Sequence, residues 1–187
     1  MLPETVLTLS LVILLLPLLG FTILIFFGKK LGRLSGVIET SILLISFLLA
    51  IVVAYSKISL FNDIKIIQSN VEWINFGQIP KSGTFSVIVG IGLDNLSAIM
   101  LIVVTLISFL VHLFSIGHMA DDVRFSRYFA YLGFFTFSML GIVLTNNFLL
   151  MYIFWELVGI SSYLLIGHWY ERKSASDAAH ASGWNWC

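Results

Sequence analysis

Residues 128–169 read YFAYLGFFTFSMLGIVLTNNFLLMYIFWELVGISSYLLIGHW, two long apolar runs divided only by Thr145, Asn146 and Asn147. A helix of about 20 apolar residues crosses the hydrocarbon core of a bilayer. Three polar residues can form only a tight turn between two helices. The runs at residues 128–144 and 148–169 are therefore predicted to form an antiparallel pair of membrane-spanning helices.

Three similar runs precede this pair, at residues 6–27, 37–55 and 96–116. The first is expected to be a retained span and not a signal peptide, because its basic residues follow the apolar run instead of preceding it. Of the 187 residues, 59% are hydrophobic and 11% are charged, whereas a soluble domain carries about 25% charged residues. The expected fold class is an all-α transmembrane bundle of five helices, in a membrane domain at residues 1–179.

The loop at residues 56–93 is the one sizeable piece expected to lie outside the membrane. Residues 71–76 alternate between apolar and polar side chains apart from the apolar neighbours Trp73 and Ile74, and residues 84–89 are rich in β-branched side chains. Pro80 and Gly83, which lie between the two segments, are typical turn residues. The loop is therefore predicted to contain a short β-hairpin on the outer surface.

Basic residues predict the orientation, because cytoplasmic loops are enriched in lysine and arginine. With the N-terminus outside, the cytoplasmic side holds seven of them: Lys29, Lys30, Arg33, Arg124, Arg127, Arg172 and Lys173. The outer side keeps three, Lys57, Lys65 and Lys81. The predicted arrangement has the N-terminus outside and the C-terminus in the cytoplasm, in a bacterial plasma membrane or alternatively an organellar inner membrane.

Composition also excludes several classes of function. Ten basic and ten acidic residues give zero formal charge. The sequence also lacks the basic stripe that nucleic-acid binding requires. Cys187 is the only cysteine, and the four histidines stand apart in sequence without ligand spacing. Neither a dinucleotide fingerprint nor a nucleophile motif occurs. No nucleic acid, metal or cofactor is expected on this chain.

Glu156 is the strongest candidate for a chemical role, because it lies near half depth in the last apolar run. A charged side chain at that depth costs roughly 2.5–3.5 kcal/mol on insertion scales, so Glu156 is expected to be buried against protein or internal water. Tyr152, Gly159 and Tyr163 share its helix face. Such a carboxyl can accept and release a proton. The alternative is a structural carboxyl that bonds to one of those tyrosines and fixes helix packing.

His112, toward the inner end of the run at residues 96–116, is a second candidate, because imidazole titrates near neutral pH and can relay protons. The alternative is a histidine that only satisfies a helix interface. Asp94 is expected to cap the start of this run, and Glu39 is expected to reach water near the inner surface. The charged residues before the fourth run are expected to form a solvated loop: Asp121, Asp122, Arg124 and Arg127.

Three stretches of the chain resemble a known family. They read LDNLSAIM at residues 93–100, FLVHLFSIGHM at 109–119 and WELVGISSYLLIGHWY at 155–170. They are similar to the antiporter-like membrane-arm subunit of respiratory complex I, which is chain 5 or chain L of the proton-translocating NADH–quinone oxidoreductase. The large subunit of multisubunit sodium/proton antiporters shares much of this pattern.

The resemblance implies that Glu156 takes part in proton translocation, paired with a lysine two helices later, and that His112 matches the third-span histidine of the family. It also implies that FMN, iron–sulfur clusters and quinone belong to other subunits. The NADH:quinone oxidoreductase activity would be that of the complex, and this chain would hold no redox centre. The expected partners are the other membrane-arm subunits and the lipid bilayer.

The family departs from this chain in length. Its members continue through further spans related by inverted repeats, whereas this sequence has five apolar runs and ends in HASGWNWC at residues 180–187. These last residues do not fit the family's continuation, so a truncated or frameshifted N-terminal fragment, inactive alone, is expected. The alternatives are a fragment of a multisubunit sodium/proton antiporter and a membrane fragment that transports nothing.

Overall fold

The computed structural model describes residues 2–61, 64–79, 83–171 and 173–184. Five long helices follow the five apolar runs: α1 (Pro3–Leu31), α2 (Leu34–Leu60), α3 (Asn95–His118), α4 (Phe125–Leu144) and α5 (Phe148–Ile166). A 3-10 turn, η1 (Gly167–Trp169), and a short helix, α6 (Lys173–Trp184), follow them. With η1 counted in the fifth span, all five are long and apolar enough to cross a membrane. The predicted fold class is therefore confirmed.

Particular residues set the ends of these helices. Gly32 ends α1 with a φ of 53°, a left-handed conformation that glycine adopts without steric cost. Asp94 caps α3 as predicted, because its carboxylate accepts a hydrogen bond of 2.6 Å from the N–H of Ser97, and this bond lowers the pKa of Asp94. The ammonium group of Lys57 donates to the carbonyls of Phe61 and Ile64. Because α2 continues to Leu60, residues 56–60 of the predicted outer loop are helical.

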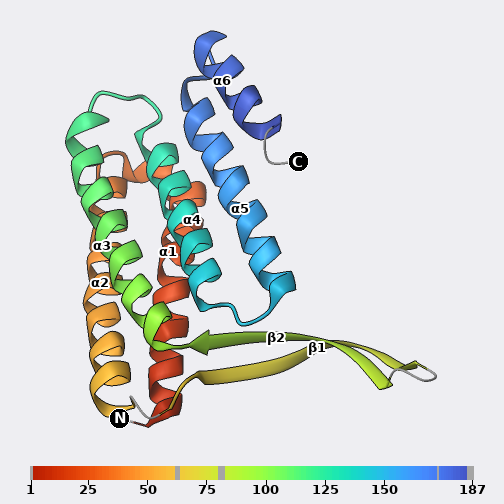
Figure 1. Ribbon diagram of the computed structural model, residues 1–187. Helices are drawn as coiled ribbons and strands as arrows, with labels where there is room; N and C mark the ends of the chain where they lie inside the picture. Colours follow the sequence, from red (N-terminus) through yellow and green to blue (C-terminus); the bar gives the residue numbers. More distant parts are fainter. Residues whose placement is uncertain (1, 62–63, 80–82, 172, 185–187) are drawn as a thin grey trace.

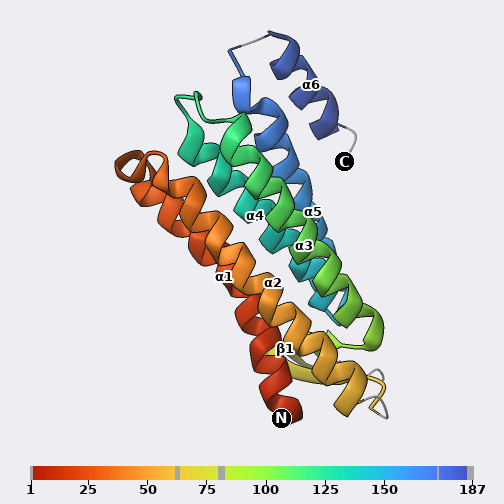
Figure 2. The same cartoon turned by 90° about the vertical axis from the view of Figure 1, so that its left-hand side faces the viewer.

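Helices α1 to α4 form the body of the bundle (Figures 1 and 2). α1 packs against α2 and α4, while α3 packs against α2 and α4. One end of the bundle, here the hairpin end, carries the N-terminus and the strands. The other, the basic end, carries the turn between α1 and α2 and the loop between α3 and α4. Each end has its own buried apolar cluster, centred on Ile13 and Leu101 at the hairpin end and on Phe125 and Phe129 at the basic end.

The predicted hairpin is present and longer than its sequence signal. Strands β1 (Ile67–Ile79) and β2 (Gly83–Leu93) pair antiparallel, with Val71 opposite Val89. The hairpin passes beneath the turn between α4 and α5 and extends beyond the bundle (Figure 1). Asn146 of that turn fastens it, because its amide nitrogen donates to the side chain of Asn70 at 2.6 Å. The sheet is therefore attached to the turn that joins the last two spans.

Candidate functional site

Glu156 occupies the middle of α5, as the ninth of its 19 residues. Helix α5 lies at the edge of the bundle and packs against α4, η1 and α6 (Figure 1). Glu156 is half-buried, and Ser161 is the buried residue among those described in α5. Tyr152 and Tyr163, predicted to share its face, are 57% and 39% exposed. The described part of the chain therefore encloses Glu156 only in part, and its proton-carrying role stays a prediction.

His112 is fully buried in α3. Its Nδ1 lies 2.8 Å from the carbonyl oxygen of Ser108, and since a carbonyl only accepts, Nδ1 carries the hydrogen. That tautomer leaves Nε2 with its lone pair, and Nε2 is buried without a hydrogen-bond partner among the described residues. The imidazole meets the ring of Phe129 edge-on, with centroids 5.8 Å apart. His112 thus has one nitrogen able to accept a proton inside the bundle.

The two predicted site residues lie on opposite sides of α4. Helix α4 packs against α3, which carries His112, and against α5, which carries Glu156. The described contacts do not bring the two side chains together. Any proton transfer between them would require intervening groups.

The expectation that Glu39 reaches water is wrong. Its side chain is fully buried where α2 meets α1 and α4. Both carboxyl oxygens are buried, and neither has a hydrogen-bond partner among the described residues. The sequence did contain the signal, an acidic residue inside an apolar run, but the position of Glu39 near the start of that run suggested contact with water. Glu39 therefore joins Glu156 as an acid inside the membrane-spanning part.

The expectation of a solvated loop is also wrong for Asp122, whose side chain is only 12% exposed. Its carboxylate accepts hydrogen bonds from the indole of Trp169 at 2.8 Å and the backbone N–H of Arg124 at 2.6 Å, and lies 3.3 Å from Nε2 of His168. Burial opposes the charge of Asp122, but these hydrogen bonds and the nearby imidazole lower its pKa overall. Asp122 therefore ties the α3–α4 loop to η1.

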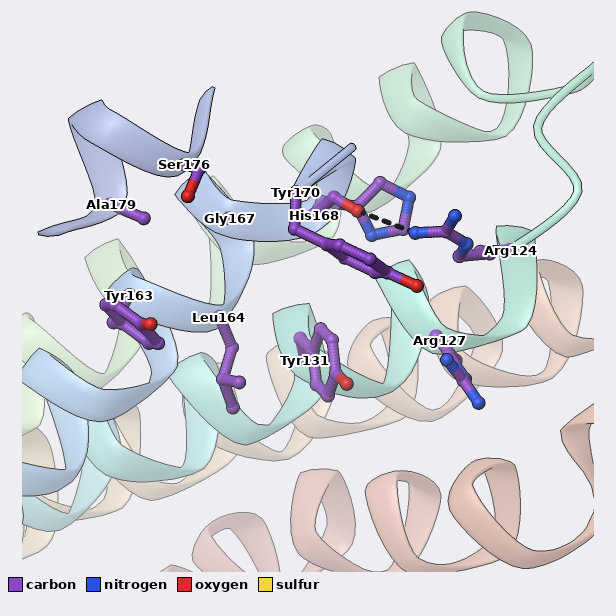
Figure 3. A pocket seen from close by; sticks show the side chains of 10 residues that line it. All are labelled: Arg124, Arg127, Tyr131, Tyr163, Leu164, Gly167, His168, Tyr170, Ser176 and Ala179. Atoms are coloured by element: carbon purple, nitrogen blue, oxygen red, sulfur yellow. Dashed lines mark hydrogen bonds between the residues drawn. The ribbon is translucent and has the colours of Figure 1, made fainter. Parts of the chain in front are cut away.

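Arg124 extends this attachment toward the end of α5. Its guanidinium donates to the carbonyl of His168 at 3.3 Å and lies 4.5 Å from the ring centroid of Tyr170 (Figure 3). It also donates to the carboxylate of Glu171. No sequence signal links these residues, because the loop and the end of the fifth span lie far apart in the chain. The cluster is a structural tie at the basic end.

Beside this tie lies a cleft of about 230 Å³ between α4, α5, η1 and α6. Figure 3 shows the side chains that line it, with Tyr131 of α4 beside Leu164 of α5. Among the described residues, no group of three or more histidine, cysteine, aspartate or glutamate side chains is placed to hold a metal ion. The groups that line this cleft offer hydrogen bonding and the positive charge of Arg124 and Arg127.

Two family models match the chain. Residues 79–129 match the model described as NADH-ubiquinone oxidoreductase (complex I), chain 5 N-terminus. Residues 145–183 match the model described as NADH:quinone oxidoreductase/Mrp antiporter, TM. The second match contains Glu156, and the first contains His112 and the Asp122 loop.

Similar proteins agree with these models. NAD(P)H-quinone oxidoreductase chain 5 of Synechocystis is 40% identical over 87% of this chain and 24% of its own length. NADH-quinone oxidoreductase subunit L of Rhodobacter capsulatus is 42% identical over 90% of this chain and 23% of its own length. NADH-ubiquinone oxidoreductase chain 5 of Cryphonectria parasitica is 39% identical over 89% of this chain and 24% of its own length. The chain thus spans about a quarter of the length of these relatives, and the predicted resemblance is confirmed.

Proposed function

Because the chain is homologous to part of chain 5 and subunit L of NADH–quinone oxidoreductase, we propose that it is part of a proton-translocating membrane subunit. In this proposal Glu156 carries a proton and His112 relays protons. Electron transfer on other subunits, which hold the FMN, the iron–sulfur clusters and the quinone site, drives the movement. The partners are the other membrane-arm subunits and the surrounding lipid.

The observation that supports this function best is a half-buried carboxyl at mid-depth of a span, inside the segment that matches the NADH:quinone oxidoreductase/Mrp antiporter model. Holding a charge at that depth against lipid costs roughly 2.5–3.5 kcal/mol on insertion scales. One side of α5 packs on α4, and large apolar residues on the remaining surface, such as Trp155 and Ile160, are 52% exposed. The relatives are about four times as long, and we propose that further segments of a complete subunit cover the exposed surface of α5 and supply a cation for Glu156.

The test uses a complete subunit that carries the same residues, assembled in its complex. Glu156→Gln keeps the size of the side chain but removes the proton that it exchanges. We expect quinone reduction to continue and proton pumping to fall sharply, with assembly unchanged. Asp177→Asn, the same change of an acid to its amide at an exposed position of α6, is the control and should pump normally. Wild-type pumping by Glu156→Gln would exclude the proton-carrying role.

A sodium/proton antiporter remains the second candidate, because the model that matches residues 145–183 names both kinds of protein. The two functions differ in their driving force. Complex I activity moves protons only while quinone is being reduced, whereas an antiporter moves protons in response to a sodium gradient without any redox substrate. Proton movement driven by sodium alone would favour the antiporter.

A further inference from the structure

The side chain of Glu39 lies in a space that two glycines leave open. A methyl group added at Gly20 of α1, or at Gly133 of α4, would collide with the Glu39 carboxyl. The carboxyl therefore projects from α2 into the junction of three helices and does not return to the membrane surface. Glu39 lies about 8 Å along α2 from Leu34, taking 1.5 Å per residue, so this junction lies within the span.

Among the described residues, Glu39 forms no ion pair. The bases nearest to it along its own and the neighbouring helix are Arg33, six residues before Glu39, and Arg127, six residues before Gly133. Helix α1 carries no ionisable side chain between Ile13 and Leu24, and α2 carries none other than Glu39 between Gly36 and Val53. The neighbouring stretch of α4 carries Tyr128 and Tyr131, and α3 carries His112. An unpaired buried carboxylate is costly, so the stable form of Glu39 in this setting is the protonated acid.

The basic end offers a polar approach to this acid. A cleft of about 700 Å³ opens there, and Gly28, Gly32 and Ser126 line it. The hydroxyl of Ser126 donates to the carbonyl of Gly28 at 2.8 Å and lies 3.0 Å from the hydroxyl of Ser35. This chain of hydroxyls and carbonyls leads from the cleft to the first turn of α2.

Two aromatic rings lie between the end of that chain and Glu39. A methyl group at Gly36, three residues before Glu39, would meet the rings of Phe125 and Phe129 at 2.8 and 3.2 Å. Phe129 also contacts the ring of His112. Among the described residues, Glu39 and His112 are the two whose side chains have buried polar atoms without a partner. Both lie beside the same stretch of α4, from Phe129 to Gly133.

We propose that Glu39 is a second proton-binding carboxyl of this bundle, which exchanges its proton with the cleft at the basic end when the Phe125 and Phe129 rings move aside. The site is independent of Glu156, which lies on a helix that does not line the Gly20–Glu39–Gly133 junction. It therefore holds whether or not the proton-carrying role of Glu156 does.

Infrared spectroscopy of the purified 187-residue chain in lipid tests the proposal, because a protonated carboxyl has a carbonyl band that a carboxylate lacks. Surface acids are ionised at neutral pH, with ordinary pKa values of about 4. The Glu156→Gln chain should retain a protonated-carboxyl band at neutral pH, and the double variant with Glu39→Gln should lose it. Absence of the band from Glu156→Gln, or its survival in the double variant, would overturn the proposal. Circular dichroism checks that both variants remain helical.

Exchange with deuterated water tests the route. Deuteration shifts the carbonyl band of an acid, so the rate of that shift reports how fast the Glu39 proton leaves. Phe129→Leu should accelerate the shift relative to the otherwise unchanged chain, because it removes part of the aromatic barrier. Phe148→Leu, at an exposed position on α5, is the matched control and should leave the rate unchanged. Equal rates in all three proteins would exclude the route past Phe129.

Discussion

Gly20→Ala is the substitution that tests the packing around Glu39 most directly. The added methyl group would collide with all three heavy atoms of the Glu39 carboxyl. Overpacking of this kind typically costs about 1–3 kcal/mol, since neighbouring side chains must leave their preferred rotamers. The gain of roughly 0.5–1 kcal/mol for alanine over glycine in a helix offsets part of this cost at Gly20. Gly117 on α3 is a matched control, because nothing lies within 4 Å of a methyl group there and replacing a helical glycine with alanine gains roughly 0.5–1 kcal/mol.

The free energies of unfolding, measured in mixed micelles of rising denaturing detergent content, should therefore change in opposite directions for Gly20→Ala and Gly117→Ala. Removing the carboxyl with Glu39→Ala should relieve the collision. The double variant Gly20→Ala/Glu39→Ala should then be more stable than the sum of the single effects predicts, with a coupling within the 0.5–3 kcal/mol range that contacting residues show. Equal effects at the two glycines, or strict additivity with Glu39→Ala, would show that the carboxyl does not occupy this junction.

Three further predictions concern the ends of the bundle. Asp122→Asn removes the charge beside His168 and should lower the free energy of unfolding by about 1–3 kcal/mol at neutral pH. Because the pKa of Asp122 is depressed in the folded chain, the stabilisation by its carboxylate should persist above a pH of about 4 and fade below it. The free energies of unfolding of the variant and the parent should therefore converge in acid. Asp94→Ala removes the cap from the N–H of Ser97 and should cost roughly 0.5–2 kcal/mol in the same assay, whereas Asp94→Ser should cost less. Cys187, the only cysteine, should react with a membrane-impermeant maleimide in intact bacterial cells only after permeabilisation, and labelling of unpermeabilised cells would contradict the predicted cytoplasmic C-terminus.

The sequence predicts the helices and the hairpin because both depend on local properties. Hydropathy over about 20 residues decides whether a segment can span the bilayer, and the β-branched side chains of residues 84–89 favour a strand. Asp94 as a helix cap is equally local, since its partner Ser97 lies three residues away. These predictions need no knowledge of which helices become neighbours.

The predictions for Glu39 and Asp122 failed because tertiary contacts decide their surroundings. Position near the start of an apolar run suggested that Glu39 meets water, but Gly20 and Gly133 come from two other helices. Asp122 lies in a charged stretch that looks solvated, yet Trp169 and His168 reach it from the end of the fifth span. A single sequence without structural information does not show which distant glycine or aromatic residue will face a given acid.

Glu39 and Glu156 therefore differ in what experiments on this chain can test. Helices of the chain itself enclose Glu39 completely, so its protonation depends on the folding of α1, α2 and α4 and is measurable on the purified chain. Glu156 is only half-buried among the described residues, and its proposed role includes a cation that other segments of a complete subunit would supply. The role of Glu156 must be tested in the assembled complex, whereas that of Glu39 is testable without it.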